Sequence, residues 1–327
     1  MKKLICLFVL LLLYNTSYGI EYKDINIPSA VVIDNTTHRI LYDKNCHEKR
    51  SIASLTKVLT SILLVEACNL DEVVTVPNDA TWIGGSEVGL KKNDNITVYN
   101  LLVGMLLPSG NDCAYTTAIH VGGNIENFAK MMNDKAMEIG CLNSSFANPH
   151  GLDNESHYST AYDMALITSY ALKNKTIADI VSSKSLNIKF GNTSKNINNT
   201  NRLLSGYPYT NGVKTGYTAL AERCLITSAI KDDFNIITVV LGASTTDIRF
   251  NTAKKLMEDT YNIYKVTDIS NIFKFNINLD VKKSKIKIVK NISRNFICPL
   301  KDDELDKIYV VQEFKNNLKA PLYKNEY

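Results

Sequence analysis

The sequence predicts an α/β fold in which one β-sheet is assembled from both ends of a large domain and covered by helices, followed by a small all-β domain. Three observations predict it. Two strand-like segments come first, a long helix-rich block follows, and several strand-like segments then return. Because a sheet and a helix each have an apolar face to bury, helices packed on a sheet satisfy both.

Alternating apolar and polar residues mark the strands. Residues 30–43 alternate, as at Val31 and Ile33, on either side of the turn-forming pair Asn35-Thr36, which predicts a β-hairpin. Further strands are expected at 185–190, 212–215, 224–230 and 234–241. Apolar residues at helical spacing predict helices at 54–68, 98–106, 111–121, 125–139, 161–172 and about 246–264.

After Lys265 the pattern changes to alternation with a period of two, as in 272–279 and 285–289, which predicts a small β domain over 266–327. Lysines in 282–290 fit a solvated strand face at least as well as a surface for an anionic wall or membrane. Residues 316–321 end in Pro321, where an amphipathic membrane helix would have to run. No strong membrane anchor is therefore expected.

The first residues have the pattern of a secretory signal. Two lysines precede an apolar run over residues 4–14, and Ser17 and Gly19 are spaced like a cleavage site. The run is shorter than the ~20 apolar residues that a bilayer requires. We therefore expect a signal peptide over 1–19, a main domain over 20–265, and secretion across the cytoplasmic membrane.

Composition excludes several classes of protein. The 327 residues are 45% hydrophobic and 21% charged, with a net charge of +4 that falls by two when the lysines of the signal are removed. Such a balance predicts no nucleic acid or other polyanion as partner. The cysteines after the signal form no Cys-x-x-Cys pair, so no metal or cofactor is expected, and buried free thiols are favoured over disulfides.

Ser54 and Lys57 form a candidate catalytic pair. They are three residues apart, so on a helix they lie on one face, one turn from each other. A lysine that acts as a base must be neutral, and burial or a nearby cation lowers its pKa. Ser284 and Lys287 have the same spacing in a strand-like segment, where they would point to opposite faces.

Two further motifs follow. Ser109-Gly110-Asn111 occupies a turn between two helices, and Ser-x-Asn recurs elsewhere in the chain, where a helix cap is the simpler interpretation. Lys214-Thr215-Gly216 opens a strand-rich run, and its glycine would let a substrate backbone lie close to the strand. Alone, Lys214 is more often a solvated strand lysine than a ligand.

Ser-x-x-Lys, Ser-x-Asn and Lys-Thr-Gly in this order are the motifs of class A β-lactamases and penicillin-binding proteins. The sequence resembles the low-molecular-weight D-alanyl-D-alanine carboxypeptidases of that superfamily, over about residues 25–265. The resemblance implies a β-lactamase-like sheet with helices on both faces. It is carried by segments 53–57, 107–112, 146–152, 157–161 and 211–218.

The resemblance also implies roles for the motif residues. Ser54 attacks the carbonyl between two D-alanines, Lys57 takes its proton, and Ser109 relays a proton to the leaving amine. The backbone N–H groups of Ser54 and Tyr217 form the oxyanion hole. The partners it implies are peptidoglycan stem peptides ending in D-Ala-D-Ala and, as inhibitors, β-lactam antibiotics, and the location is extracytoplasmic and associated with the cell wall.

The resemblance implies that a second set of residues binds the substrate. Asn111 binds the substrate amide, and Lys214 with Thr215 holds the terminal carboxylate beside Gly216. His150 and His157 lack metalloprotease spacing, so structural roles are favoured.

The sequence departs from the family at Glu222-Arg223, where relatives usually have a glycine, and this pair either blocks or reshapes the site. One alternative is a class A-like β-lactamase, although the Glu138 to Asn143 segment misses the lactamase Glu-x-x-Leu-Asn pattern by one residue. Another is an inactive penicillin-recognising protein that binds the wall.

Overall fold

The computed structural model describes residues 26–273, 275–279, 288–292 and 296–308. The chain divides into two compact units, of which the larger ends at Tyr261 and the smaller begins at Asn262. The expected signal peptide over 1–19 and the segment 316–321 lie outside the described residues. The domain boundary expected after residue 265 stays a prediction.

The main sheet is antiparallel and has the strand order β2-β1-β9-β8-β7. Its first two strands precede the helical block and its other three follow it, as the sequence predicts. The strands are β1 (Ser29–Asp34), β2 (Ile40–Lys44), β7 (Thr210–Thr218), β8 (Glu222–Lys231) and β9 (Phe234–Ala243).

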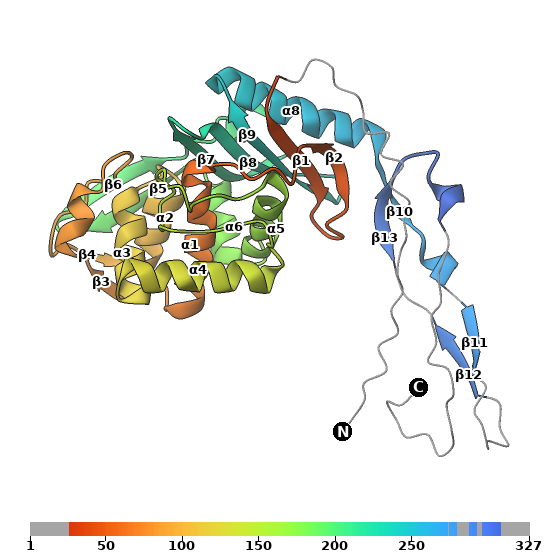
Figure 1. Cartoon of the computed structure of the whole chain (residues 1–327), viewed down its shortest axis with the longest axis horizontal. Helices are drawn as coiled ribbons and strands as arrows, with labels where there is room; N and C mark the ends of the chain where they lie inside the picture. The colour runs from red at the N-terminus through yellow and green to blue at the C-terminus, as the bar shows by residue number, and fades with distance from the viewer. Residues whose placement is uncertain (1–25, 274, 280–287, 293–295, 309–327) are drawn as a thin grey trace. The chain divides into compact units, whose positions relative to one another are not determined.

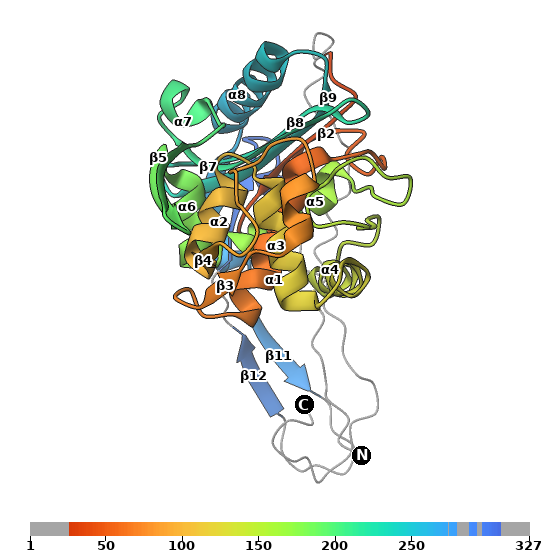
Figure 2. The same ribbon diagram turned by 90° about the vertical axis from the view of Figure 1, so that its left-hand side faces the viewer.

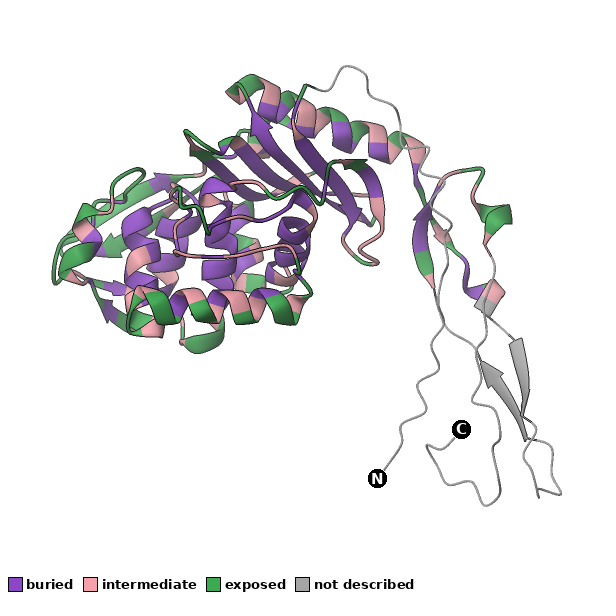
Figure 3. Cartoon of the chain, in the orientation of Figure 1, coloured by how far each residue is buried: buried purple, intermediate pink, exposed green. Residues whose placement is uncertain are grey.

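Helices cover both faces of this sheet, which confirms the predicted fold class. Helix α8 lies along one face and the remaining large helices lie on the other (Figures 1 and 2). Strand β1 is buried along its whole length, as a strand covered on both faces must be (Figure 3). The helices are α1 (Lys57–Ala67), α2 (Val98–Leu106), α3 (Asn111–Gly122), α4 (Ile125–Ile139), α5 (Ala161–Ala171), α6 (Lys175–Ser182), α7 (Leu203–Gly206) and α8 (Thr246–Ile263).

Helix α1 is the centre of the helical layer. It contacts α2, α3, α4 and α5, and every residue from Lys57 to Leu64 is buried. A helix that is apolar on all sides has to be enclosed by other elements. The helix therefore carries Lys57 into the interior of the protein.

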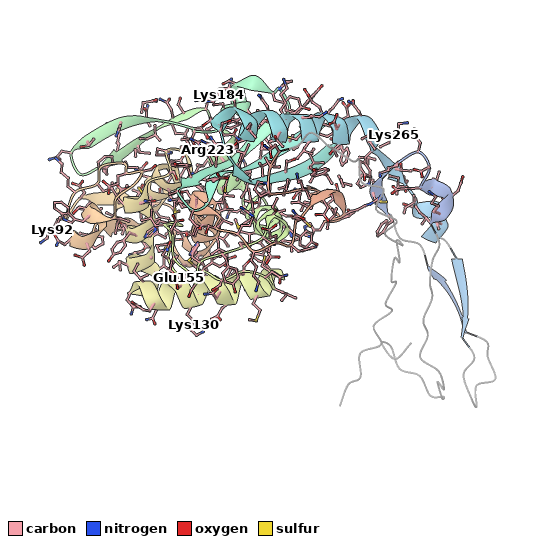
Figure 4. All side chains as sticks on the ribbon, turned by 45° about the horizontal axis from the view of Figure 1, so that its top comes forward. Lys92, Lys130, Glu155, Lys184, Arg223 and Lys265 are labelled. Carbon is pink, nitrogen blue, oxygen red and sulfur yellow. The ribbon has the colours of Figure 1, made fainter. Side chains whose placement is uncertain are left out.

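Helix α4, in contrast, is amphipathic and lies on the surface. Phe128, Met132 and Ala136 recur every four residues and form its buried face. Lys130 pairs with Asp134 on the opposite face, and Figure 4 shows Lys130 projecting outward. The strong periodicity explains why the predicted bounds agree with the observed ones.

A second, four-stranded sheet with the order β3-β4-β5-β6 corrects the sequence analysis, which placed residues 185–190 in the main sheet. Alternation predicts that this segment is a strand, but it does not predict its partner. The three-residue strands of this sheet are too short for a recognisable pattern. Its strands are β3 (Val73–Thr75), β4 (Asn95–Thr97), β5 (Ser185–Phe190) and β6 (Thr193–Asn198).

The described residues of the smaller unit form two antiparallel strand pairs, β10 (Lys265–Asp268) with β13 (Ile297–Leu300) and β11 (Phe275–Leu279) with β12 (Ile288–Ile292). Ile269, Cys298 and Leu300 form a small apolar cluster of its own. The described residues of this unit also include two 3₁₀ turns, η3 (Ser270–Phe273) and η4 (Leu305–Lys307). Among the described residues of the whole chain, no helix has the length and apolar character needed to cross a membrane.

Candidate active site

Ser54 lies in a 3₁₀ turn, η1 (Ala53–Thr56), that leads directly into α1. The helix expected from residue 54 therefore begins as a tighter turn, and Lys57 is the first residue of the α-helix proper. Side chains three residues apart eclipse one another in a 3₁₀ turn. Lys57 Nζ lies 2.8 Å from Ser54 Oγ, so the two predicted residues are in contact.

The Lys57 amine is enclosed by polar groups that fit its neutral form. It is fully buried, and its Nζ also lies 2.7 Å from Asn111 Oδ1 and 2.8 Å from the carbonyl oxygen of His150. A neutral amine has two N–H donors for these two oxygens and one lone pair for a hydroxyl proton. Burial, and then the charge of Lys214, lower the pKa of Lys57 well below its usual value.

The Ser-x-Asn motif contributes one unpaired hydroxyl and one fixed amide. Ser109 Oγ is buried and has no hydrogen-bond partner among the described residues. Asn111 begins α3, and its Nδ2 donates to the carbonyl oxygen of Gly84 at 2.7 Å. The backbone N–H of Asn111 donates to Ser86, so the 84–86 segment is held beside the site. This segment follows the short 3₁₀ turn η2 (Asn78–Trp82).

The Lys-Thr-Gly motif lies on β7, the strand at the end of the main sheet. Lys214 is 1% exposed, and its Nζ donates to the carbonyl oxygen of Thr215 at 2.9 Å. Thr215 Oγ1 lies 2.6 Å from Thr200 Oγ1. A Cβ on Gly216 would lie 3.1 Å from the backbone N of Ser54, a tight contact, so the glycine favours the close approach of β7 to η1.

Arg249 is a site residue that the sequence analysis missed. It lies on α8, is 8% exposed, and its Nη1 donates to the carbonyl oxygens of Gly216 at 3.3 Å and Cys224 at 3.4 Å. Burial, and then the charge of Arg249, lower the pKa of Lys214 to about 7. The buried basic side chains of Lys214, on β7, and Arg249, on α8, make this region attractive to an anion. A single arginine on a helix gives no sequence signal for this role.

His157 supports the turn that carries Ser54, as the sequence analysis favours. Its Nδ1 accepts the backbone N–H of Ala147 at 3.0 Å, so its Nε2 carries the proton and donates to Thr56 Oγ1 at 2.8 Å. Thr56 in turn donates to the carbonyl oxygen of Ala53. Burial is the main cause that lowers the pKa of His157 to about 4 and that of His150 to about 3.

The Glu222-Arg223 pair lies outside the cluster formed by Ser54, Lys57 and Asn111. Arg223, labelled in Figure 4, has its guanidinium carbon 4.9 Å from the centre of the Tyr217 ring, and its Nη1 donates to the carbonyl oxygen of Ser244 at 2.7 Å. The Glu222 side chain is exposed, and its φ of 52° is the conformation that favours glycine. The pair therefore shapes the surface beside Tyr217.

Glu138, the nearest match to the lactamase glutamate, belongs to an ion-pair network on α4. It pairs with Lys135 at 2.7 Å on the exposed face of α4. Lys135 also pairs with Glu66, so the carboxylate belongs to a surface network.

Comparison with known proteins places this arrangement in a family. The family model described as D-alanyl-D-alanine carboxypeptidase matches residues 17–245. The D-alanyl-D-alanine carboxypeptidase DacF of Bacillus subtilis is 35% identical over 307 residues, which cover 91% of this chain and 79% of that protein. DacC of Escherichia coli is 36% identical over 251 residues, 73% of this chain and 62% of that protein.

Solved structures agree with the sequence matches. The D-alanyl-D-alanine carboxypeptidase DacD from Francisella tularensis has a TM-score of 0.76 at 27% identity, covering 92% of this chain and 87% of that one. The Streptomyces K15 DD-transpeptidase has a TM-score of 0.70 at 31% identity, covering 73% and 98%. The chain therefore belongs to the D-alanyl-D-alanine carboxypeptidase family, as its three motifs predict.

Proposed function

We propose that this serine D-Ala-D-Ala carboxypeptidase removes the terminal D-alanine of peptidoglycan stem peptides with Ser54 as nucleophile and Lys57 as base. One observation carries the assignment: the Ser54 hydroxyl lies 2.8 Å from the amine of a fully buried lysine. A serine hydroxyl is a weak nucleophile at neutral pH unless a neighbouring base takes its proton.

Acylation begins when neutral Lys57 takes the Ser54 proton and Ser54 Oγ attacks the carbonyl carbon between the two D-alanines. The negative charge that develops on the carbonyl oxygen is bound by the backbone N–H groups of Ser54 and Tyr217. The close approach of Gly216 to the Ser54 nitrogen supports this pairing across η1 and β7. Fixed donors of this kind typically contribute about 3–4 kcal/mol to the transition state.

The bond to the terminal D-alanine then breaks as Ser109 gives its hydroxyl proton to the leaving amine. Ser109 takes a replacement proton from protonated Lys57, which leaves Lys57 neutral for the next step. The Ser109 hydroxyl is suited to this relay because it is buried and uses no described protein group as a partner. Water then attacks the acyl-enzyme ester, Lys57 accepts the water proton, and Ser54 leaves with a proton returned from Lys57. The cycle ends with the shortened peptide, free D-alanine and the original enzyme.

The terminal carboxylate is bound by Lys214 and Thr215, with the charge of Arg249 behind them. Both cationic side chains are buried, so their attraction for an anion is screened little by water. β7 is the end strand of its sheet, and its free edge offers backbone groups to an extended peptide, which Asn111 holds from the other side.

A β-lactam imitates the D-alanyl-D-alanine end and binds to members of this family, and we propose that it acylates Ser54. Because Glu138, the nearest match to the lactamase glutamate, is held in a surface ion-pair network, it does not serve as a deacylation base, and we expect release of the β-lactam to be slow. The substrate lies in the cell wall, so we also propose that the chain is exported and that cleavage leaves Ile20 at the new N-terminus. Exported protein whose intact mass includes residues 1–19 would contradict the cleavage.

The test combines labelling with substrate comparison. Purified wild type is labelled with fluorescent penicillin and the modified residue is mapped by mass spectrometry, with Ser54→Ala expected to abolish labelling and Lys57→Ala to remove nearly all of it. D-alanine release is measured on diacetyl-lysyl-D-alanyl-D-alanine and on its C-terminal amide. Lys214→Ala should slow release from the acid far more than from the amide. Release of D-alanine by Ser54→Ala would overturn the role of Ser54 as nucleophile. An equal loss of activity on both substrates in Lys214→Ala would overturn the role of Lys214 as carboxylate anchor.

A further inference from the structure

Three side chains with different metal-binding atoms meet on the surface of the larger unit. Cys68, Glu72 and His120 place a thiol sulfur, a carboxylate oxygen and an imidazole nitrogen within 4.8 Å of one another. Cys68 follows the last residue of α1, Glu72 lies in the turn before β3, and His120 lies in the last turn of α3. His120 Nε2 is already 2.8 Å from Glu72 Oε1.

We propose that this cluster binds a zinc ion through Cys68, Glu72 and His120. Thiolate, imidazole and carboxylate are the three protein ligands of Zn²⁺, whereas Mg²⁺ and Ca²⁺ take oxygen ligands. Zinc bonds of about 2.0–2.3 Å in a tetrahedral arrangement separate the ligand atoms by about 3–4 Å. The three atoms already lie near these separations, so small side-chain rotations complete the site, and water occupies the fourth position.

Cys68 differs from the other described cysteines in a way that suits a ligand. All six are free thiols, but Cys68 alone is partly exposed and the other five are buried. The sequence analysis expects a buried thiol here, and the structure corrects this because α1 ends at Ala67, which leaves Cys68 at the edge of the core. An accessible thiol can lose its proton to a metal, which a thiol sealed in the core cannot do readily.

The backbone on either side of the ligands is fixed before any metal arrives. The N–H of Cys68 donates to Leu64 at the end of α1, and the turn that follows accepts hydrogen bonds from the start of α2, from Val98 to Glu72 and from Tyr99 to Leu70. Helices α1 and α3 pack directly on each other. A preformed site loses little conformational entropy on binding, which favours affinity.

The proposed zinc ion would stabilise the packing of two helices, and its ligands lie away from the proposed catalytic residues. α1 has 11 residues, so its end is about 16 Å from the end that carries Lys57. The ion would join the end of α1 to the end of α3, whose first residue is Asn111. It would therefore clamp two helices that position the site without touching the substrate. Glu72 and His120 are 48 positions apart, which hides the site from any sequence motif.

The test uses reduced, untagged protein, because a polyhistidine tag would bind the same ions. Co²⁺ titration should give one equivalent of bound metal with a thiolate-to-cobalt absorption band, and Zn²⁺ should displace it. Cys68→Ser should abolish the band, and His120→Ala and Glu72→Gln should weaken affinity by at least about 10–100-fold, the loss typical even for residues that only support a ligand. His47→Ala, which replaces another exposed histidine, should bind metal like the wild type.

Penicillin labelling of every variant reports whether it has folded, and labelling should be equal with and without zinc. A zinc-dependent rise in the unfolding temperature of wild type that is lost in Cys68→Ser would support the clamp. The proposal is overturned if wild type binds no stoichiometric cobalt, if the complex lacks the thiolate band, or if Cys68→Ser binds zinc as tightly as His47→Ala.

Discussion

At the scale of single residues, two buried lysines have different proposed roles in the same cleavage reaction. Lys57 is surrounded by two carbonyl oxygens and a hydroxyl, and burial together with Lys214 favours its neutral form. Lys214 is buried too, with a pKa near 7, so a bound carboxylate can return it to the charged state. In the proposed mechanism, Lys57 therefore serves as a base and Lys214 as an anion anchor.

This difference predicts the pH dependence of the reaction. As pH rises through about 7, free Lys214 loses its proton, so kcat/KM for the peptide acid should fall on the alkaline side. The peptide amide does not need the charge, and its kcat/KM should keep its value there. Lys214→Arg should remove the alkaline fall, because arginine stays charged. Rates of D-alanine release across this range are the measurement, and an equal fall for acid and amide would contradict the prediction.

Glu222 offers a prediction on stability. Its φ of 52° costs an L-residue roughly 1–2 kcal/mol, and glycine removes that cost. Glycine also makes the unfolded chain more flexible, which offsets part of this gain. Glu222→Gly should therefore raise the free energy of unfolding by about 1 kcal/mol. Urea denaturation measures this as a higher midpoint with an unchanged slope. Glu155→Gly, at an exposed turn residue without positive φ, is the control and should give no gain.

At the scale of elements, the site depends on the close packing of three backbone segments. The 3₁₀ turn η1 carries Ser54, β7 packs on it through Gly216, and Gly151 lies against its other side. A Cβ on Gly151 would lie 1.9 Å from the carbonyl oxygen of Ala53, a separation no real structure tolerates. Gly151 and Gly216 therefore let two backbone segments come close to the turn that carries Ser54, the proposed nucleophile.

Gly151→Ala should displace η1 and with it Ser54. We expect penicillin labelling to fall by at least about tenfold and the free energy of unfolding to drop by roughly 2–4 kcal/mol, since both overpacking and a strained φ contribute. Gly140→Ala is the matched control, because Gly140 also has a positive φ, 100°, but a Cβ there meets nothing within 4 Å. The Gly140→Ala variant should lose only about 1 kcal/mol, from the positive φ alone, and should label normally. Equal penicillin labelling of Gly151→Ala and Gly140→Ala would contradict the prediction that Gly151 holds η1 in position.

At the scale of the whole molecule, the predicted site belongs to one unit. All motif residues and Arg249 lie in the larger unit, which ends at Tyr261, and α8 ends at Ile263. The smaller unit has its own strand pairs and its own apolar cluster. The proposed chemistry therefore uses residues of the larger unit alone.

A chain shortened to end at Lys265 should therefore fold and react with penicillin at a rate within about twofold of the full chain. Cutting there keeps α8 and Arg249 in place. The acylation rate with fluorescent penicillin is the measurement, with circular dichroism to verify the fold. A soluble, folded chain of this length that no longer reacted would show that the C-terminal residues contribute to the site.

The sequence by itself determined those features that depend on neighbours along the chain. Ser54 and Lys57 are three residues apart, and any helical turn brings them together. Helix α4 was predicted at its observed bounds because apolar residues recur on one face between Asn124, which caps its start, and Gly140, which ends it. The three motifs and the family they indicate follow from such local patterns.

Only the tertiary structure decided what depends on contacts between distant segments. The lowered pKa of Lys57 comes from burial and from Lys214 on another element, and Arg249 reaches β7 from a helix that has no motif. Strand β5 alternates like a main-sheet strand, yet it pairs in the second sheet. The physical reason is that spacing along the chain fixes only short-range geometry, while burial, strand partners and long-range charges are set when the whole chain packs.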